Sequence, residues 1–249
     1  MKLYVFEPAR QDRGDKRAAM LVFHGGGWNE GSAEWTFGQA QYFSTLGMVG
    51  ISVDYRLADG AETTPMDAAE DARAAVRWVR SQAKELRINR EQIVAYGESA
   101  GGQLAALTAV TGENPTKEDL NAVPNALVLF SPAIQVEKSA HFKRLMAGKE
   151  LSSLSVEEHV RTGMPPTLVI AGEMDRTIPV EVLKEFCKRM QQAHNQCGVQ
   201  VFKGVGHVLW EVDETTKSRE MAAKAKYDAF LKVDEFLASL GYIKRSHQH

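Results

Sequence analysis

Short apolar runs rich in β-formers alternate with longer helical patterns along the whole chain, and this alternation restricts the fold more than any other feature. Seven strands are expected, at residues 3–6, 19–23, 49–53, 92–96, 126–130, 167–171 and 199–202. Several are nearly continuous apolar runs, as strands buried on both faces should be. Strands that alternate with helices pair mainly in parallel. The sequence therefore predicts an α/β fold, with a mainly parallel twisted sheet and helices on both faces.

Two helices are indicated by apolar residues that recur every three or four positions. One such run extends from Ala72 to Leu86. Thr64 can cap its helix, and Pro65 suits the first helical position. A second run ends at Leu240, just before a glycine that can stop the helix. We expect the chain to close on this second helix, packed against the sheet.

The length of 249 residues fits one α/β domain, residues 1–249, better than two. No repeat, low-complexity tract or linker divides the chain. A stretch of 33 residues without a strand pattern runs from Pro132 to Met164. An insertion of this size after a central strand is expected to be a small cap or lid.

The charge balance argues against a nucleic-acid partner, because 30 basic residues face 32 acidic ones without a long block of either sign. No apolar run approaches the length of a membrane span, so a membrane partner is not expected. The start of the chain lacks the pattern of a signal peptide. A cytoplasmic protein and a secreted protein with a removed leader both stay open. The oligomeric state also stays open.

The two cysteines, Cys187 and Cys197, are ten residues apart. They could form a local disulfide in an oxidising compartment, or remain two partly buried thiols. No pair of closely spaced cysteines and no cluster of cysteine and histidine suggests a metal site, and we expect no metal and no cofactor.

The segment Gly97-Glu98-Ser99-Ala100-Gly101-Gly102 carries the strongest chemical signal. It lies between the expected strand 92–96 and a helical run, which is the context that the nucleophile-elbow motif G-x-S-x-G requires. In that motif the serine occupies a sharp turn that exposes its hydroxyl. The small residues at Gly97 and Gly101 allow neighbouring backbone to pass close by.

A triple glycine follows the strand 19–23, in His24-Gly25-Gly26-Gly27-Trp28. Consecutive glycines leave backbone N–H groups unobstructed, as a site that binds an oxyanion requires. By itself such a run could be a flexible loop. Combined with the serine motif, it predicts an oxyanion hole, because lipases and esterases pair these two motifs.

The segments His24–Gly27, Asp54-Tyr55-Arg56-Leu57 and Gly97–Gly102, in this order, resemble the α/β-hydrolase serine esterases of the hormone-sensitive-lipase-like type. The resemblance covers nearly the whole chain and is nearest to the compact acetyl, acetylxylan and feruloyl esterases. Glu98 departs from the aspartate usual in the lipase-like members. The 23 residues before His24 are also too few for their large N-terminal cap, which implies a more open pocket.

In such a fold the catalytic acid and histidine follow the serine in the chain. Asp175 comes just after the strand 167–171 and His207 after the strand 199–202, so the resemblance implies a triad of Ser99, Asp175 and His207. Glu173 is the rival acid. His207 would act as base and then as acid, while Asp175 fixes its tautomer. The N–H groups of Gly26, Gly27 and Ala100 would bind the oxyanion.

Several other side chains lie near these segments in the sequence. The aromatic residues Trp28, Trp35, Phe37 and Trp210 are candidates for the substrate pocket or for ordinary packing. The Asp54–Arg56 segment is expected to brace the glycine loop, with Arg56 in an ion pair and His24 orienting the loop. Glu98 is expected to make a structural hydrogen bond. Other histidines, such as His141, are interpreted as solvated.

The function that the resemblance implies is a carboxylesterase for short acyl chains, with acetylated plant polysaccharide or oligosaccharide as substrate. A feruloyl esterase and an arylformamidase use the same triad and remain alternatives. A non-catalytic binding module on the same scaffold is an alternative of a different class. Such modules typically lose a triad residue, whereas all three are present here.

Overall fold

Seven strands form one sheet in the computed structural model, which describes residues 1–9, 16–111, 115–210 and 215–244. All seven expected strands are present, and their bounds differ from the predicted ones by a few residues. They are β1 (Lys2–Phe6), β2 (Arg17–Phe23), β3 (Val49–Asp54), β4 (Ile88–Glu98), β5 (Ala126–Phe130), β6 (Thr167–Gly172) and β7 (Cys197–Phe202).

The strand order in the sheet is β1-β3-β2-β4-β5-β6-β7. Every neighbouring pair is parallel except β1 and β3, which are antiparallel. The prediction of a mainly parallel sheet is therefore confirmed. The carboxyl ends of the parallel strands meet at one edge, and ligand sites in such sheets lie outside that edge.

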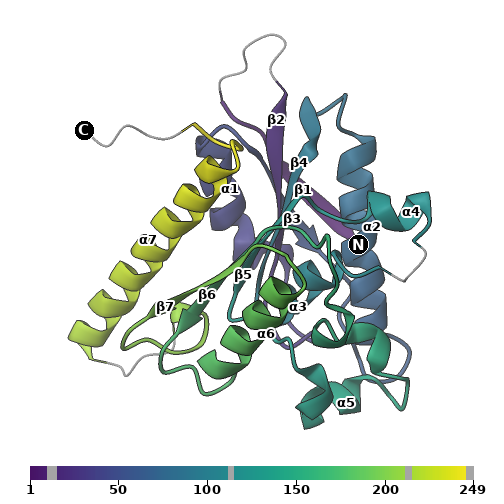
Figure 1. The fold of residues 1–249 in the computed structure, drawn as a ribbon, viewed down its shortest axis with the longest axis vertical. Helices are drawn as coiled ribbons and strands as arrows, with labels where there is room; N and C mark the ends of the chain where they lie inside the picture. The colour runs from purple at the N-terminus through teal and green to yellow at the C-terminus, as the bar shows by residue number, and fades with distance from the viewer. Residues whose placement is uncertain (10–15, 112–114, 211–214, 245–249) are drawn as a thin grey trace.

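Helices cover both faces of the sheet. Side chains along each strand point alternately to opposite sides, so each layer of helices packs against every second residue of a strand. In β2, Leu21 and Phe23 pack in the core beneath one layer of helices, whereas Met20 and Val22 pack beneath the other. The first layer contains α2 (Pro65–Ser81), α3 (Ala100–Leu107) and α6 (Val180–Gln192). The second contains α1 (Phe37–Thr45) and α7 (Thr216–Ser239), which Figure 1 shows on the opposite side of the sheet from α2.

Helix α2 begins as the sequence predicts, with Thr64 at the N-cap, Pro65 in the first turn and Asp67 closing a capping box. It ends at Ser81, earlier than the apolar pattern up to Leu86 suggested. The chain has to turn there in order to enter β4 at Ile88, and the backbone N–H of Ile88 donates to the carbonyl of Ala83 within that turn. Helix α7 ends at Ser239, followed by Leu240 and by Gly241 with a positive φ.

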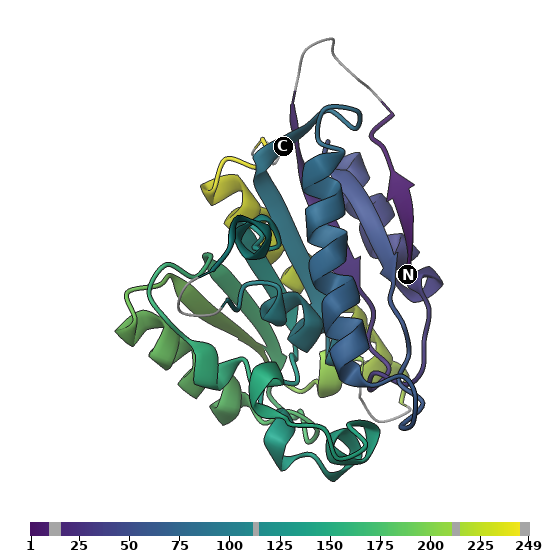
Figure 2. The same cartoon turned by 90° about the vertical axis from the view of Figure 1, so that its right-hand side faces the viewer.

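Residues 132–164, called the insert below, connect β5 to β6 at the carboxyl edge of the sheet (Figures 1 and 2). The insert contains α5 (Ala140–Leu145) and the short 3₁₀ helices η2 (Val136–Lys138), η3 (Ser152–Leu154) and η4 (Glu157–His159). Phe142, Leu154 and Val156 are buried in the same core as α2 and α3. The insert is therefore packed firmly onto the sheet layer beneath it.

The described part of the chain also contains η1 (Ala33–Thr36), α4 (Lys117–Asn121) and η5 (His207–Leu209). A disulfide joins Cys187 of α6 to Cys197 at the start of β7. This bond resolves the alternatives that the sequence left open for the two cysteines. Among the described helices, none combines the length and the apolar character needed to cross a membrane.

Candidate active site

Ser99 occupies the sharp turn between β4 and α3. Its φ is 53° and its ψ is −114°, a backbone conformation that residues other than glycine rarely adopt. The backbone N–H of Ser99 donates to the carbonyl of Phe130 on β5, which ties the turn to the next strand. The motif needs glycine at Gly101 and Gly97 because a larger residue would not fit. A Cβ added to Gly101 would lie 2.2 Å from the carbonyl oxygen of Phe23, and a Cβ added to Gly97 would lie 2.0 Å from the carbonyl oxygen of Gly101.

The structure brings Ser99, His207 and Asp175 together at the carboxyl edge of the sheet. His207 is the first residue of η5, after β7, and Asp175 lies in the turn after β6. His207 Nε2 is 2.9 Å from Ser99 Oγ, and His207 Nδ1 is 2.9 Å from Asp175 Oδ2. Serine, imidazole and carboxylate thus form one continuous hydrogen-bonded chain.

The surroundings of Asp175 favour its ionised form. Its other oxygen, Oδ1, accepts hydrogen bonds from the backbone N–H groups of Thr177 and Ile178, at 2.9 and 2.8 Å. Burial by itself raises the pKa of the Asp175 carboxyl, but the hydrogen bonds from His207 and Ile178 outweigh it and hold the pKa below its ordinary value. An ionised Asp175 accepts from Nδ1–H of His207, and in that tautomer Nε2, which faces Ser99 Oγ, carries no proton. Glu173, the rival acid, is exposed and accepts instead from the N–H of Gly204.

The glycine loop after β2 lies beside the serine turn. A Cβ added to Gly25 would lie 3.6 Å from the Cβ of Ser99. Gly26 has a φ of 105°, and a Cβ at this position would lie 2.2 Å from the carbonyl oxygen of Glu30. Within the described residues, no protein acceptor is bound to the N–H groups of Gly26, Gly27 or Ala100. The loop therefore offers backbone donors next to Ser99, which is the arrangement that an oxyanion hole needs.

A buried histidine and tyrosine support the glycine loop from below. The ring of His24 is fully buried, and its Nδ1 lies 2.7 Å from the carbonyl oxygen of Gly25. Burial lowers the pKa of His24, which favours a neutral ring. Tyr55 stacks on this ring at 4.2 Å and donates its hydroxyl proton to the carbonyl of His24. Arg56 forms ion pairs with carboxylates of α2, so the expected brace is present.

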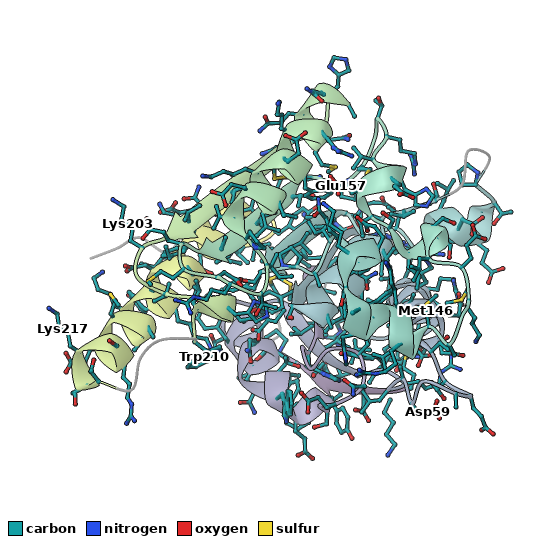
Figure 3. The ribbon with its side chains drawn as sticks, turned by 90° about the horizontal axis from the view of Figure 1, so that it is seen from below. Asp59, Met146, Glu157, Lys203, Trp210 and Lys217 are labelled. Carbon is teal, nitrogen blue, oxygen red and sulfur yellow. A yellow bond between two sulfur atoms is a disulfide. The ribbon has the colours of Figure 1, made fainter. Side chains whose placement is uncertain are left out.

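Within the described ranges, two cavities open at Ser99, one on each side. The insert-side cavity has a volume of about 500 Å³ and is walled by the insert, by the loop after Asp175 and by α6. The α7-side cavity has a volume of about 540 Å³ and is walled by the glycine loop, η1, α1 and α7. His207 lines only the α7-side cavity of the two. Figure 3 looks onto this edge of the molecule, with Met146 on the side of the insert and Trp210 on the side of α7.

The four aromatic candidates for the substrate pocket have different positions. Trp28 lines the insert-side cavity, whereas Trp35 and Trp210 line the α7-side cavity. For Phe37 the structure shows the alternative of ordinary packing. Phe37 lines neither of these two cavities, and its ring, at the start of α1, packs against Tyr4 and Phe6 of the antiparallel edge strand β1.

Two residues at the site were not found from the sequence. Gln103, fully buried in α3, accepts a hydrogen bond from Trp28 Nε1 and donates one to the carbonyl of Leu154 in the insert. His141 of α5 was interpreted as solvated, but its Nε2 lies 3.0 Å from the carbonyl oxygen of Gly27. Both residues link the insert to the glycine loop. No local signal could have revealed them, because their partners lie 51 to 114 residues away in the chain.

Glu98 has the structural hydrogen bonds that were expected for it. Its Oε1 accepts from the hydroxyl of Tyr96, at 2.6 Å, and from the amide nitrogen of Gln39, at 3.0 Å. Burial raises the pKa of Tyr96 well above its ordinary value, so its hydroxyl remains a donor. In the described residue ranges, no three side chains of His, Cys, Asp or Glu gather as a metal site requires.

Known proteins share this architecture. Esterase 2 of Thermogutta terrifontis, solved after phosphoramylation by tabun, is 32% identical, with 98% of this chain and 91% of that one covered and a TM-score of 0.85. The same esterase has been solved with butyrate bound, and that structure has a TM-score of 0.83. The fold and this similarity define the class of the protein as an α/β-hydrolase of the serine-esterase type.

Similarity to a family model then identifies the family. The BD-FAE model matches residues 3–138, more than half of the chain, and the chain belongs to this family. Esterase LipC of Mycobacterium tuberculosis is 28% identical over 80% of this chain, and an acetylxylan esterase of Xylanibacter ruminicola is 28% identical over 68%. The chain spans 55% and 36% of the lengths of these two relatives.

Proposed function

We propose that this protein is a serine carboxylesterase in which Ser99 is the nucleophile, His207 the base and Asp175 the residue that orients His207. The observation that carries the proposal is the chain of two 2.9 Å hydrogen bonds through His207. A serine hydroxyl is a weak nucleophile until a neighbouring base removes its proton. His207 lies between the other two residues, so it can take the proton of Ser99 at Nε2 while Asp175 holds its Nδ1.

In the proposed reaction, Ser99 Oγ attacks the carbonyl carbon of the ester while its proton passes to His207 Nε2. The negative charge that develops on the carbonyl oxygen is bound by the N–H groups of Gly26, Gly27 and Ala100. His207 then donates its proton to the departing alcohol oxygen, and the acyl group remains on Ser99. A water molecule, deprotonated by His207, hydrolyses this acyl-enzyme and restores the serine.

The position of His207 supports an assignment of the two cavities to the alcohol and the acyl group. The leaving alcohol has to accept a proton from His207 Nε2, so it lies in the cavity that His207 lines, which is the α7-side cavity. The acyl group then enters the insert-side cavity. We propose accordingly that the insert, residues 132–164, acts as a small cap over the acyl group, within a single domain of residues 1–249.

The proposed substrates are esters of short acyl groups, above all acetyl esters of plant polysaccharides or oligosaccharides. This choice is supported by the similarity to an acetylxylan esterase and to an esterase with butyrate bound. The open α7-side cavity is suited to bulky alcohols. No cofactor is required for this chemistry, because the triad supplies both the nucleophile and the proton transfers.

A feruloyl esterase is the second candidate, and one observation favours it. The insert-side cavity, at about 500 Å³, is larger than an acetyl group needs, and Trp28, Val136 and Ile178 give it apolar walls. An aromatic acyl group could stack there against Trp28. The ratio of rates on acetyl and feruloyl esters distinguishes the two candidates.

The test combines active-site labelling with a substrate panel. Wild-type protein should react with a fluorophosphonate at Ser99, and it should hydrolyse 4-nitrophenyl acetate and butyrate faster than the octanoate. Release of acetate from acetylated xylan and of ferulate from feruloylated arabinoxylan is measured in parallel. Folded protein that neither reacts with the fluorophosphonate nor hydrolyses any ester would contradict the proposal and favour a non-catalytic binding module.

A further inference from the structure

The α7-side cavity continues outward into a second hollow between α1 and α7. This outer groove has a volume of about 450 Å³, and Tyr227 and Phe230 of α7 form part of its wall. It shares Gln39, Trp210 and Lys226 with the α7-side cavity. The two hollows therefore form one trough that leads from Ser99 to the outer surface of α7. A small leaving alcohol would fill only its inner end.

Exposed aromatic rings follow the length of this trough. Trp35 is 59% exposed at the inner cavity, Trp210 is 57% exposed at the junction of the two hollows, and Tyr227 is 66% exposed at the outer groove. Exposed rings that gather beside a site usually mark a surface for a ligand. Flat rings bind best to ligands that also have flat apolar faces.

The central ring of the trough is fixed by a charged side chain. The ammonium group of Lys226 lies 3.4 Å from the centroid of the Trp210 ring, in a cation–π contact. Lys226 is also among the residues that line both hollows, so this donor faces the trough. Gln39, whose amide nitrogen donates to Glu98, provides a second polar group there. Two polar side chains thus line both hollows together with Trp210.

We propose that this trough binds the leaving alcohol as an extended saccharide chain, whose sugar rings stack on Trp210 and Tyr227 beyond the esterified sugar at Ser99. The inference rests on the proposed function and adds a binding surface for the alcohol portion. Sugars combine apolar ring faces with hydroxyl groups around their rims, which matches a surface where aromatic rings lie beside Lys226 and Gln39. A long alkyl alcohol matches only the rings and would leave the polar groups without partners.

The experiment measures kcat/KM on acetylated β-1,4-linked xylo-oligosaccharides of one to four sugars. We expect kcat/KM of the wild type to rise about tenfold from one sugar to four, mainly through a lower KM, since each added contact in the trough contributes binding energy. In Trp210→Ala and Tyr227→Ala, the ratio of kcat/KM for four sugars to that for one sugar should fall towards one. Circular dichroism and melting temperatures establish that each variant is folded.

Trp78→Ala is the matched control, because Trp78 is also an exposed tryptophan but lies on α2, in the opposite layer of helices. It should keep the wild-type length dependence. Unacetylated xylotetraose should bind Ser99→Ala protein and change its tryptophan fluorescence, and it should bind more weakly when Trp210 is also replaced.

The possible outcomes separate the two proposals. Absence of activity on 4-nitrophenyl acetate and on every sugar ester would contradict the esterase itself. Activity that does not rise with sugar length, or a rise that survives both aromatic substitutions, would overturn the inference while leaving the esterase intact. A rise along a series from ethyl to octyl acetate, without one along the sugar series, would assign the trough to an alkyl alcohol and also overturn the inference.

Discussion

A tryptophan lines each of the two cavities at Ser99, but one tryptophan is buried and the other is exposed. Trp28 on the insert side is 4% exposed, bound to Gln103 and packed edge-on against Phe142 of the insert. Trp210 on the α7 side is 57% exposed, and the ammonium group of Lys226 lies over its ring. A buried tryptophan forms a rigid wall, whereas an exposed one forms a platform. The enzyme that we propose therefore restricts the acyl group more tightly than the alcohol.

Loss of the proposed nucleophile should abolish the hydrolysis of every ester, whatever its acyl group or alcohol. In Ser99→Ala, we expect kcat to fall roughly a million-fold, as in other serine hydrolases that lose the serine. The melting temperature should stay within a few degrees of the wild type. Hydrolysis of 4-nitrophenyl esters and fluorophosphonate labelling provide the measurements. A variant that kept the wild-type rate would show that the two cavities do not share this nucleophile.

Loss of the orienting carboxylate should reduce every rate by the same factor. In Asp175→Asn, we expect kcat to fall by about 10⁴, because the amide stabilises the wrong tautomer of His207. Since Asp175 contacts neither cavity, the preferences for acyl group and alcohol should not change. Glu173→Gln is the matched control and should alter kcat less than twofold. An equal loss in both variants would contradict the choice of acid.

Filling the insert-side cavity tests which side holds the acyl group. Val182 of α6 lines that cavity and is only partly buried. In Val182→Trp, kcat/KM for the butyrate ester should fall at least tenfold relative to the acetate, since one methylene in an apolar pocket is worth about 10- to 200-fold. The order of preference among alcohols should remain. A change in alcohol preference instead would reverse the assignment of the two cavities.

Removing the link between the insert and the glycine loop tests how rigid the insert side is. In Gln103→Leu, Trp28 Nε1 and the carbonyl of Leu154 lose their buried partner. Each unsatisfied buried group costs about 1 to 3 kcal/mol, so the melting temperature should fall by roughly 5 to 10 °C. The ratio of kcat/KM for the acetate ester to that for the butyrate ester should shift, whereas the dependence of kcat/KM on the length of the alcohol should stay as in the wild type. Thermal denaturation and the same substrate panel measure both.

Loss of the disulfide should have the smallest effect on specificity, because Cys187 and Cys197 line neither cavity. The double substitution to serine opens a short loop and should cost about 2.5 kcal/mol of unfolding free energy. Denaturant titration measures this loss. Acyl and alcohol preferences should match those of the wild type, and a change in either would mean that α6 transmits its position to the insert side.

Much of the fold and the triad could be predicted from the sequence, because the relevant signals are local. Each strand is a short apolar run, and Ser99, Asp175 and His207 each follow such a run. Since the carboxyl ends of parallel strands meet at one edge, residues that follow strands are expected to lie together there. The strained turn at Ser99 also requires glycines that can be read directly from the motif.

Most of what the sequence left open or missed involves contacts between distant segments. The sequence could not decide between pocket lining and packing for Phe37, because its partners lie on β1, whose antiparallel pairing with β3 has no local signature. His141 contacts a carbonyl 114 residues earlier in the chain. The end of α2 was placed too late, because the apolar pattern continues into the turn that leads to β4.

The sequence by itself determined the order of the strands, the serine turn and the choice of Ser99, Asp175 and His207 as residues that meet at one edge, because these depend on neighbouring residues and on the geometry of parallel strands. The tertiary structure decided which tryptophan became a wall and which a platform. Burial depends on atoms contributed by the insert at Trp28 and by α7 at Trp210. Those atoms come from distant parts of the chain, so no local pattern around either tryptophan could reveal them.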